Sequence, residues 1–179
     1  MLDHPQITIT QGLLAALLEN NVAVVTCDAK HLPVGMLLPM EGHYTQAESM
    51  RAQIAASEPL KKQIWQQIVI GKIKNQAALL ERLDRPFASM LTYAKNVKSG
   101  DPDNYEARAA IYYRANLWPR EMNFRRNPDG DAPNHLLNYG YAILRAIVAR
   151  SLVGAGLLPS LGIHHSNKYN DLDLQLPLG

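Results

Sequence analysis

Several features that mark particular classes of protein are scarce or missing in this sequence. There is one cysteine, Cys27, which excludes a disulfide bond within the chain. It lies in the apolar run 22–27, so we expect a buried thiol in a reducing compartment. Residues 1–11 carry neither a basic start nor an apolar core and therefore no recognisable signal peptide, so we expect the chain in the cytoplasm.

The charge of the chain is low and nearly balanced. Charged residues make up 19% of the sequence and hydrophobic residues 47%, which is typical of a folded, soluble protein rather than a disordered one. With 179 residues, the chain is long enough for one ordinary core and a smaller appendage. The formal net charge is +2 and the pI is near 8.7. This pI is below about 9, above which charge alone would suggest nucleic-acid binding.

The first 42 residues differ in character from the rest. Residues 5–10 alternate as a half-buried strand does, residues 11–20 suit a short helix, and residues 22–27 read as a buried strand. Two strands are too few to be stable alone, so this segment looks like the tail of a β domain, or else a small flap on the rest. Residues 28–42 hold two prolines and two glycines, which predicts a linker or an ordered loop.

Nothing beyond residue 42 has the pattern of a strand. Apolar residues recur there at helical spacing, and caps or helix breakers separate the segments. The expected helices cover residues 44–57, 58–82, 86–98, 103–117 and about 134–153. We therefore predict a mainly α fold, with an all-helical domain of about six helices in residues 43–179 and a small α/β remnant with its linker in residues 1–42.

The last expected helix is long and apolar. One face is predicted to be buried, and it carries Leu137, Tyr141, Leu144 and Val148. Arg145 and Arg150 lie inside the apolar run, and a charge near a bilayer centre costs at least about 2.5 kcal/mol, so we expect no membrane span. Gly154 and Gly156 tolerate the positive φ that ends a helix. Two adjacent histidines, His164 and His165, follow.

The helix expected at 58–82 is rich in basic residues. It has two acidic residues and five basic ones: Lys61, Lys62, Lys72, Lys74 and Arg82. Such a face would suit contact with a phosphate backbone, although a solvated helix surface is the commoner explanation.

A carboxylate is placed unusually on the helix expected at 103–117, which Asp101 or Asp103 can cap. Because residues three, four, seven and eleven apart return to one side of a helix, Glu106 shares a face with apolar residues. These are Ala109, Ala110, Tyr113 and Leu117. A part-buried acid needs a partner, so Glu106 is a candidate site residue.

One possible partner is a divalent metal ion shared with a histidine. Imidazole with carboxylate suits manganese or zinc, and carboxylates with water suit magnesium. The spacing of these residues in the sequence does not by itself favour a metal site over the alternatives. The same pattern also fits histidines that cap a helix or form hydrogen bonds in the core. It also fits a Glu106 that pairs with an arginine.

Several blocks of the sequence resemble one known family. NYEARAAIYYRANLW and LNYGYAILRAIVARSLVGAGLLPSLGIHH resemble the helical domain of the CRISPR-associated integrase, the universal protein of spacer acquisition. HLPVGMLLPMEG, the isolated Gln53 and KIKNQAALL are similar to the subtype that accompanies single-protein RNA-guided effectors. The resemblance runs from about Leu2 to Asn170, with the blocks in the family's order.

The resemblance implies a divalent-metal-dependent DNA endonuclease that inserts short foreign DNA into a CRISPR array, using Mg²⁺ or Mn²⁺. It implies an N-terminal β domain followed by an all-helical catalytic domain, in dimers bridged by a small ferredoxin-like companion. The DNA partners would be the protospacer and the CRISPR repeat. We also expect a homodimer because a truncated β domain should leave an exposed edge.

The resemblance also assigns roles to residues. Glu106 and His165 match the family's catalytic, metal-binding glutamate and histidine, the latter by its place three residues after the glycine of an L-G-x-x-H pattern. No acid matches the position of the family's third ligand, and Asp173, or else Asp171, is the candidate substitute, although both come early. Arg114, Arg125 and Arg126 are candidates to hold the DNA backbone, or else surface or structural residues.

Two departures from the family's pattern favour an alternative. The N-terminal β domain is nearly absent, and the acid expected about a dozen residues past His165 would fall near Pro177 and Leu178, which cannot ligate a metal. The chain would then be a non-catalytic helical DNA-binding or assembly module. A third hypothesis is a helical metalloprotein unrelated to DNA. The blocks that resemble the family, in the family's order, disfavour it.

Overall fold

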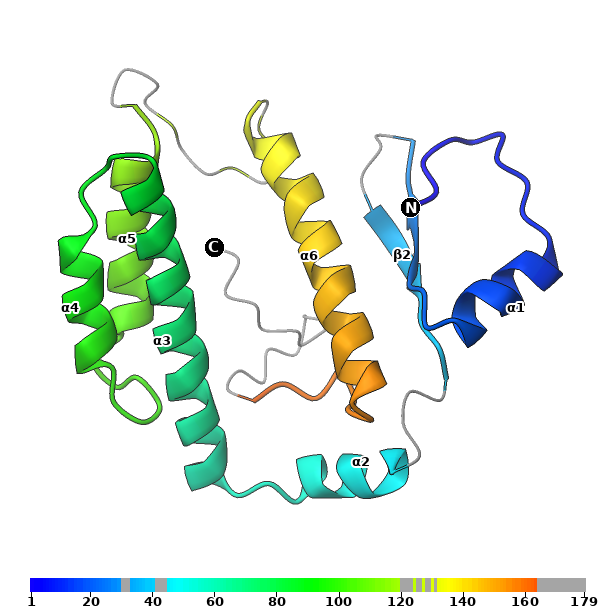
Figure 1. Ribbon diagram of the computed structural model, residues 1–179, viewed down its shortest axis with the longest axis horizontal. Coiled ribbons are helices and arrows are strands. Elements are labelled where there is room, and N and C mark those ends of the chain that lie inside the picture. The colour runs from blue at the N-terminus through cyan, green and yellow to red at the C-terminus, as the bar shows by residue number, and fades with distance from the viewer. Residues whose placement is uncertain are drawn as a thin grey trace. The chain divides into compact units, whose positions relative to one another are not determined.

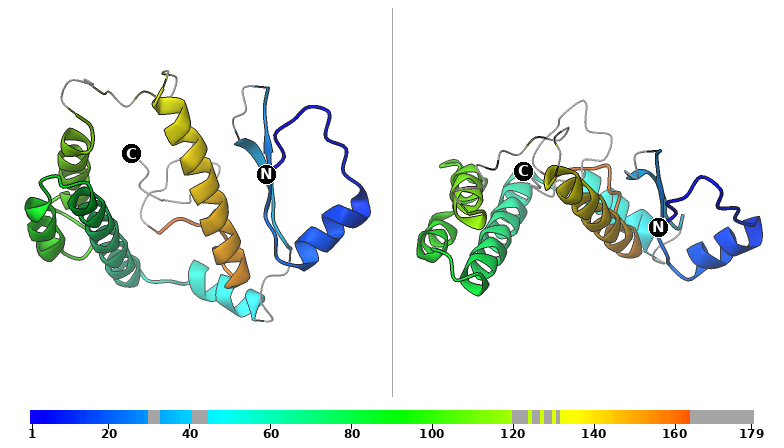
Figure 2. Two further views of the ribbon diagram at one scale, coloured as in Figure 1. Left: turned by 45° about the horizontal axis from the view of Figure 1, so that its top comes forward. Right: turned by 90° about the horizontal axis from the view of Figure 1, so that it is seen from above.

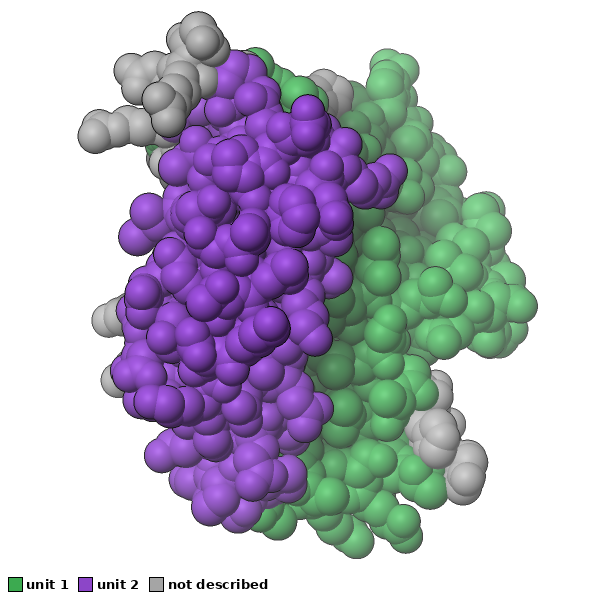
Figure 3. All heavy atoms as spheres, turned by 60° about the vertical axis from the view of Figure 1, so that its left-hand side comes forward, with its two compact units in different colours: residues 1–55, 126–162, 166–178 green, residues 56–125, 163–165, 179 purple. Residues whose placement is uncertain are grey.

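The computed structural model describes residues 1–29, 33–40, 45–119, 124, 127, 130 and 132–163. The chain divides into two compact units, which Figure 3 colours separately. One contains residues 1–55 and 126–162, and the other contains residues 56–125. The expected boundary between residues 42 and 43 stays a prediction.

The described part of the second unit contains three helices: α3 (Glu58–Arg82), α4 (Ala88–Asn96) and α5 (Tyr105–Leu117). Each of these helices contacts the other two, and Figure 1 shows α3 running beside the shorter pair. Their core consists of Trp65, Val69, Ile73, Ala77 and Leu80 from α3, Met90 and Ala94 from α4, Val97, and Ala109 from α5. The α3 positions are three or four residues apart, which places them on one side of that helix. The three helices expected at 58–82, 86–98 and 103–117 are thus confirmed.

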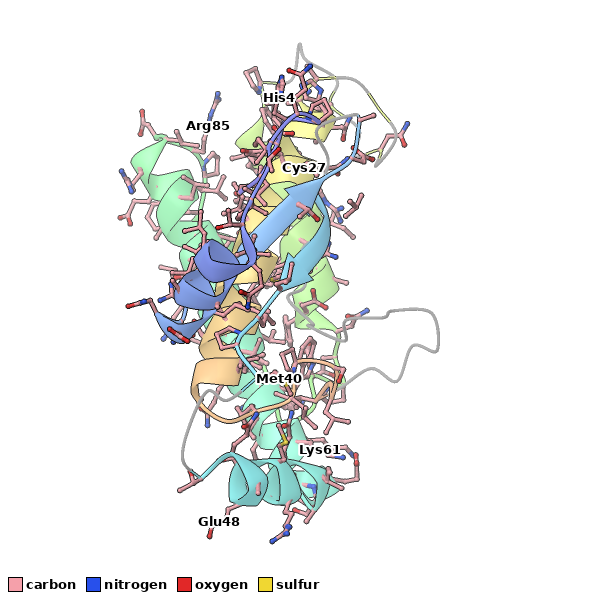
Figure 4. The ribbon with its side chains drawn as sticks, turned by 90° about the vertical axis from the view of Figure 1, so that its right-hand side faces the viewer. His4, Cys27, Met40, Glu48, Lys61 and Arg85 are labelled. Carbon is pink, nitrogen blue, oxygen red and sulfur yellow. The ribbon has the colours of Figure 1, made fainter. Side chains whose placement is uncertain are left out.

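The first unit joins a hairpin to three helices. Its elements are α1 (Gln11–Glu19), β1 (Val24–Cys27), β2 (Pro33–Leu37), α2 (Gln46–Ile54) and α6 (Asn134–Gly154). The strands β1 and β2 are antiparallel, and β2 contacts α6. Figure 2 shows this hairpin and α6 from two sides. Val24 and Val25 of β1 are buried, as the pattern predicted. The Cys27 thiol, labelled in Figure 4, is half-buried rather than buried.

Two expectations for the first 42 residues are wrong. Residues 5–10 form no strand: the chain turns at Pro5, where the amide of Ile7 donates to the carbonyl of His4 (3.1 Å). Leu2 instead bridges to Thr26 of β1, so the alternation of residues 5–10 has no partner strand.

Residues 28–42 are not only a loop, because they contain β2. Pro33 stands at the first position of β2, where a missing amide proton is tolerated. Gly35 pairs with Thr26, and a Cβ at Gly35 would lie 2.8 Å from Thr26 Oγ1. Pro33 and Gly35 are therefore part of a strand rather than of a linker.

The buried face of α6 also differs from the prediction. Ala146, Ala149 and Val153 are buried, whereas Leu144 is 41% exposed. Small residues allow close packing, and a search for rows of large apolar residues overlooks alanines. The helix ends at Gly154, and Gly156, two residues further on, has the expected positive φ of +74°.

Among the described helices, α6 alone is long and apolar enough to cross a membrane. A single helix of this kind is a weak indication, because core helices of soluble proteins meet the same criteria. Arg145 and Arg150 lie inside its apolar run.

Candidate active site

Asp101 fixes the start of α5. Its carboxylate accepts hydrogen bonds from the backbone amides of Tyr105 (2.9 Å) and Glu106 (2.8 Å), and its side chain is buried. Asn104, between the acid and the helix, has a left-handed backbone (φ 52°) that turns the chain into α5. Asp103 is instead exposed and pairs with Lys98 (2.9 Å). Of the two expected caps, the structure selects Asp101, which thereby holds the backbone of Glu106.

Glu106 is paired with a lysine from the facing helix. Nζ of Lys72 on α3 lies 2.7 Å from Oε1 of Glu106 on α5, and their side chains are 13% and 22% exposed. The expectation of a part-buried acid that needs a partner is confirmed. The partner in the structure is a lysine, not the arginine of the structural alternative. Ala109 and Ala110, both buried on the same face, let α3 approach closely enough for this contact.

The surroundings of Lys72 make its charged ammonium form less favourable than in water. Burial lowers the pKa of Lys72, the hydrogen bond and charge of Glu106 raise it, and the charge of Arg114 lowers it further, with a net shift downward. Glu106 therefore offsets part of a desolvation cost that the lysine would otherwise carry alone.

A second polar side chain of α3 lies one turn beyond Lys72. Within the described part of the chain, Oε1 of Gln76 is buried and has no hydrogen-bond partner. Residues four apart share a face of a helix, so Gln76 and Lys72 lie on the same side of α3. A buried acceptor without a donor costs roughly 1–3 kcal/mol.

The other side of α5 holds an arginine over aromatic rings. The guanidinium of Arg108 lies 4.6 Å from the ring centre of Tyr105 and 5.2 Å from that of Tyr93. Tyr93 also meets Tyr112 edge to face at 6.2 Å. These contacts join α4 to α5 and help to hold the helix that carries Glu106.

The predicted basic face of α3 is not uniform. Lys61, labelled in Figure 4, pairs with Glu58 at 3.3 Å. Lys72 turns to Glu106, and Lys74 is exposed.

In the first unit, Gln53 holds the segment that follows α6. Its amide nitrogen donates to the carbonyls of Leu158 (3.0 Å) and Leu161 (3.1 Å). Its amide oxygen accepts from the backbone amide of Leu158 (2.9 Å). The sequence pattern gives Gln53 no role, because an amide that pairs with a backbone 105 residues away has no periodic signature.

The other predicted site residues are described only in part. Arg114 is exposed on α5, and its Nε donates to the carbonyl of Ala110 (3.3 Å). His164, His165, Asp171, Asp173, Arg125 and Arg126 lie outside the described residues.

The described residues fit one ligand of a metal site. Glu106 offers a carboxylate of the kind that Mg²⁺ and Mn²⁺ prefer, and a lysine ammonium already stands beside it as a cation. Among the described residues, no group of three or more His, Cys, Asp or Glu side chains is placed to hold a metal ion. The predicted ligands His165 and Asp173 stay predictions.

Comparison with known proteins places this chain in a family. Residues 2–178 match the family described as CRISPR associated protein Cas1. The chain belongs to the Cas1 family. It is 42% identical, over 97% of its length, to the CRISPR-associated endonuclease Cas1 of Neisseria meningitidis serogroup C (strain 8013). It is 31% identical, over 90% of its length, to a CRISPR-associated endonuclease Cas1 of Pyrobaculum aerophilum. The family resemblance of the sequence is thus confirmed.

The chain spans 57% and 59% of the lengths of these two Cas1 relatives. Its structure resembles a casposase bound to integration product, with a TM-score of 0.72 and 24% identity over 93% of this chain and 52% of that one. It also resembles a chain of a partial Cas6-RT-Cas1–Cas2 complex, with a TM-score of 0.57 and 26% identity over 93% of this chain and 56% of that one. The mainly α, Cas1-like fold is thereby confirmed.

Proposed function

We propose that this chain is the helical catalytic part of a Cas1 integrase, working in the cytoplasm. In this role it is a divalent-metal-dependent DNA endonuclease that inserts short foreign DNA into a CRISPR array by attack of a 3′-hydroxyl on a phosphodiester. The half-buried carboxylate of Glu106, held on a capped helix in a chain 42% identical to a Cas1 endonuclease, carries the proposal.

In the proposed site, Glu106, His165 and Asp173 would hold Mg²⁺ or Mn²⁺. The bound ion would supply charge stabilisation at the transferring phosphate, or would activate water in the hydrolytic mode. Asp101 sets the position of the Glu106 backbone, and Lys72 holds its carboxylate in the metal-free chain. Positioning of this kind accounts for much of the rate in phosphoryl transfer.

Arg114 is the described candidate for contact with the DNA backbone. It is exposed on the helix that carries Glu106, and its described bond uses only Nε, to a backbone carbonyl. A guanidinium has further N–H donors, which suit phosphate oxygens. Arg125 and Arg126 are proposed for the same task from the sequence alone.

The proposed partners are DNA, a second copy of the chain and a small ferredoxin-like companion. The partial Cas6-RT-Cas1–Cas2 complex, one chain of which is 26% identical to this chain, supports a protein partner.

The test is Mn²⁺-dependent cleavage of branched DNA by the parent chain and by Glu106→Gln. We expect cleavage to fall at least about a hundredfold in the variant, because loss of a charge-stabilising group typically costs that much. Glu81→Gln is the matched control, since Glu81 is an exposed glutamate on α3. Equal cleavage by the parent and Glu106→Gln would refute the catalytic assignment.

A non-catalytic DNA-binding or assembly module is the second candidate. The tail DLDLQLPLG, which places Pro177 and Leu178 where the family has an acid, favours it. A Mn²⁺ titration of thermal stability separates the two candidates. A competent site raises the melting temperature, because stability grows as RT ln(1 + [L]/Kd). No shift, with DNA binding retained, would favour the module.

A further inference from the structure

The presence of a lysine at position 72 needs an explanation. Its neighbours in the core of this unit, Val69, Ile73 and Ala109, are fully buried and apolar. A buried ion pair is often no better for stability than well-packed apolar residues of similar volume. Stability alone therefore does not explain why α3 presents an ammonium ion to Glu106 rather than a methionine.

We propose that Lys72 is a positioning residue for Glu106, whose ammonium ion holds the carboxylate in the metal-free chain and is exchanged for the divalent cation when the site is loaded. The inference rests on the proposed function, and it adds a residue and an exchange that the proposed ligand set does not contain.

The geometry makes the two cations competitors. The Lys72 ammonium donates to Oε1 of Glu106 at 2.7 Å, a short, charge-assisted hydrogen bond. Two positive charges at one part-buried carboxylate repel each other strongly. Because the ammonium and a metal ion would share one carboxylate, we expect a metal ion at Glu106 to weaken or break the contact with Lys72.

The same contact protects the metal-free state. Removing one partner of a part-buried pair leaves an uncompensated charge, which is costly. Lys72 supplies the compensating charge, while Asp101 holds the backbone amide of Glu106 at 2.8 Å. Glu106 is thus restrained at its backbone by Asp101 and at its carboxylate by Lys72 before a metal ion binds.

The released ammonium has an acceptor on its own helix. Oε1 of Gln76, one turn further along α3, is buried and without a hydrogen-bond donor in the described part of the chain. Residues four apart on a helix are within reach of each other's side chains. Lys72 therefore moves from Glu106 to Gln76 on metal binding, which satisfies the amide oxygen and keeps the ammonium paired.

The test measures Mn²⁺ affinity by calorimetry, with Mn²⁺ alone as the probe and the full 179-residue chain. We expect Lys72→Met to bind Mn²⁺ at least about tenfold more tightly than the parent, because a competing positive charge is gone. Lys72→Arg, which keeps the charge, should stay close to the parent. Lys74→Met is the matched control, because Lys74 is an exposed lysine on the same helix, and its affinity should not change.

Gln76→Leu should act in the opposite direction. Without the amide oxygen the displaced ammonium has no acceptor, so Mn²⁺ should bind several-fold more weakly. A crystal structure of the parent with Mn²⁺ gives an independent readout if a variant fails to fold. It should show Lys72 Nζ beyond about 4 Å from Glu106, the usual limit of an ion pair.

Two failures are distinguishable. If Glu106→Gln binds Mn²⁺ as the parent does, the proposed site is wrong and this inference falls with it. If Glu106→Gln loses the binding but Lys72→Met matches the parent or binds more weakly, the proposed site stands and only the exchange is overturned. A Mn²⁺ complex that keeps the Lys72–Glu106 contact also overturns the exchange.

Discussion

Nζ of Lys72 and Oε1 of Glu106 lie 2.7 Å apart, although the two residues are separated by 34 positions in the sequence. The contact links α3 to α5 through a part-buried ion pair in an interface that is otherwise mostly apolar. It couples the fold to the proposed chemistry, because the carboxylate that would hold a metal ion is also a structural partner. Several measurable consequences depend on this coupling.

The first concerns pH. Burial lowers the pKa of Lys72 below its ordinary value of 10.5. Between the lowered pKa and 10.5 the unfolded chain binds more protons at this residue than the folded chain, so the free energy of unfolding rises with pH in that window. Lys72→Met lacks this contribution. Urea midpoints measured from neutral pH to 10.5 should rise more steeply for the parent than for the variant. Parallel profiles would refute the prediction.

The second concerns the cap of α5. Asp101→Ala removes the acceptor of two backbone amides, and we expect a loss of about 1–3 kcal/mol of stability in urea denaturation. Asp103→Ala is the control, since Asp103 is exposed in the same turn and should change stability by less than about 0.5 kcal/mol. Similar losses in both variants would contradict the role given to Asp101.

The third concerns the segment after α6. Gln53→Leu keeps the approximate size of the side chain but removes three hydrogen bonds to Leu158 and Leu161. Each hydrogen bond contributes about 1 kcal/mol net to stability. Without these bonds the Leu158 amide should exchange with deuterium markedly faster. Gln63→Leu, an exposed position on α3, should leave this exchange unchanged. Unaltered protection of the Leu158 amide in Gln53→Leu would show that these three hydrogen bonds do not hold the segment after α6.

The fourth concerns DNA. Arg114→Ala should weaken DNA binding similarly for all sequences and reduce the slope of log K against log salt by about 1, because one phosphate contact is lost. Arg85→Ala, which removes an exposed arginine that follows α3, is the control. The idea fails if the slopes of Arg114→Ala and the parent coincide.

Much of the second unit was predictable from local pattern. The spacing of apolar residues identified α3, α4 and α5 and placed Glu106 on a face with Ala109 and Ala110. The pattern did not identify Lys72 as the partner, because that depends on how two helices pack rather than on either helix alone. The choice between Asp101 and Asp103 likewise needed the geometry of the turn.

The first unit was harder to predict because its signals are ambiguous. Pro33 and Gly35 read as loop residues, yet they belong to β2, where strand pairing overrides local preference. In α6, which is apolar on several sides, the large residues suggested the wrong buried face.

The central claim is that Glu106 supports metal-dependent DNA joining. The most direct measurement is Mn²⁺-dependent transfer of a labelled DNA 3′-end into CRISPR repeat DNA by the parent and by Glu106→Gln, with a donor lacking the 3′-hydroxyl as a control. The account predicts a longer, labelled product with the parent only, and none without the hydroxyl. Equal product from the parent and Glu106→Gln would contradict it.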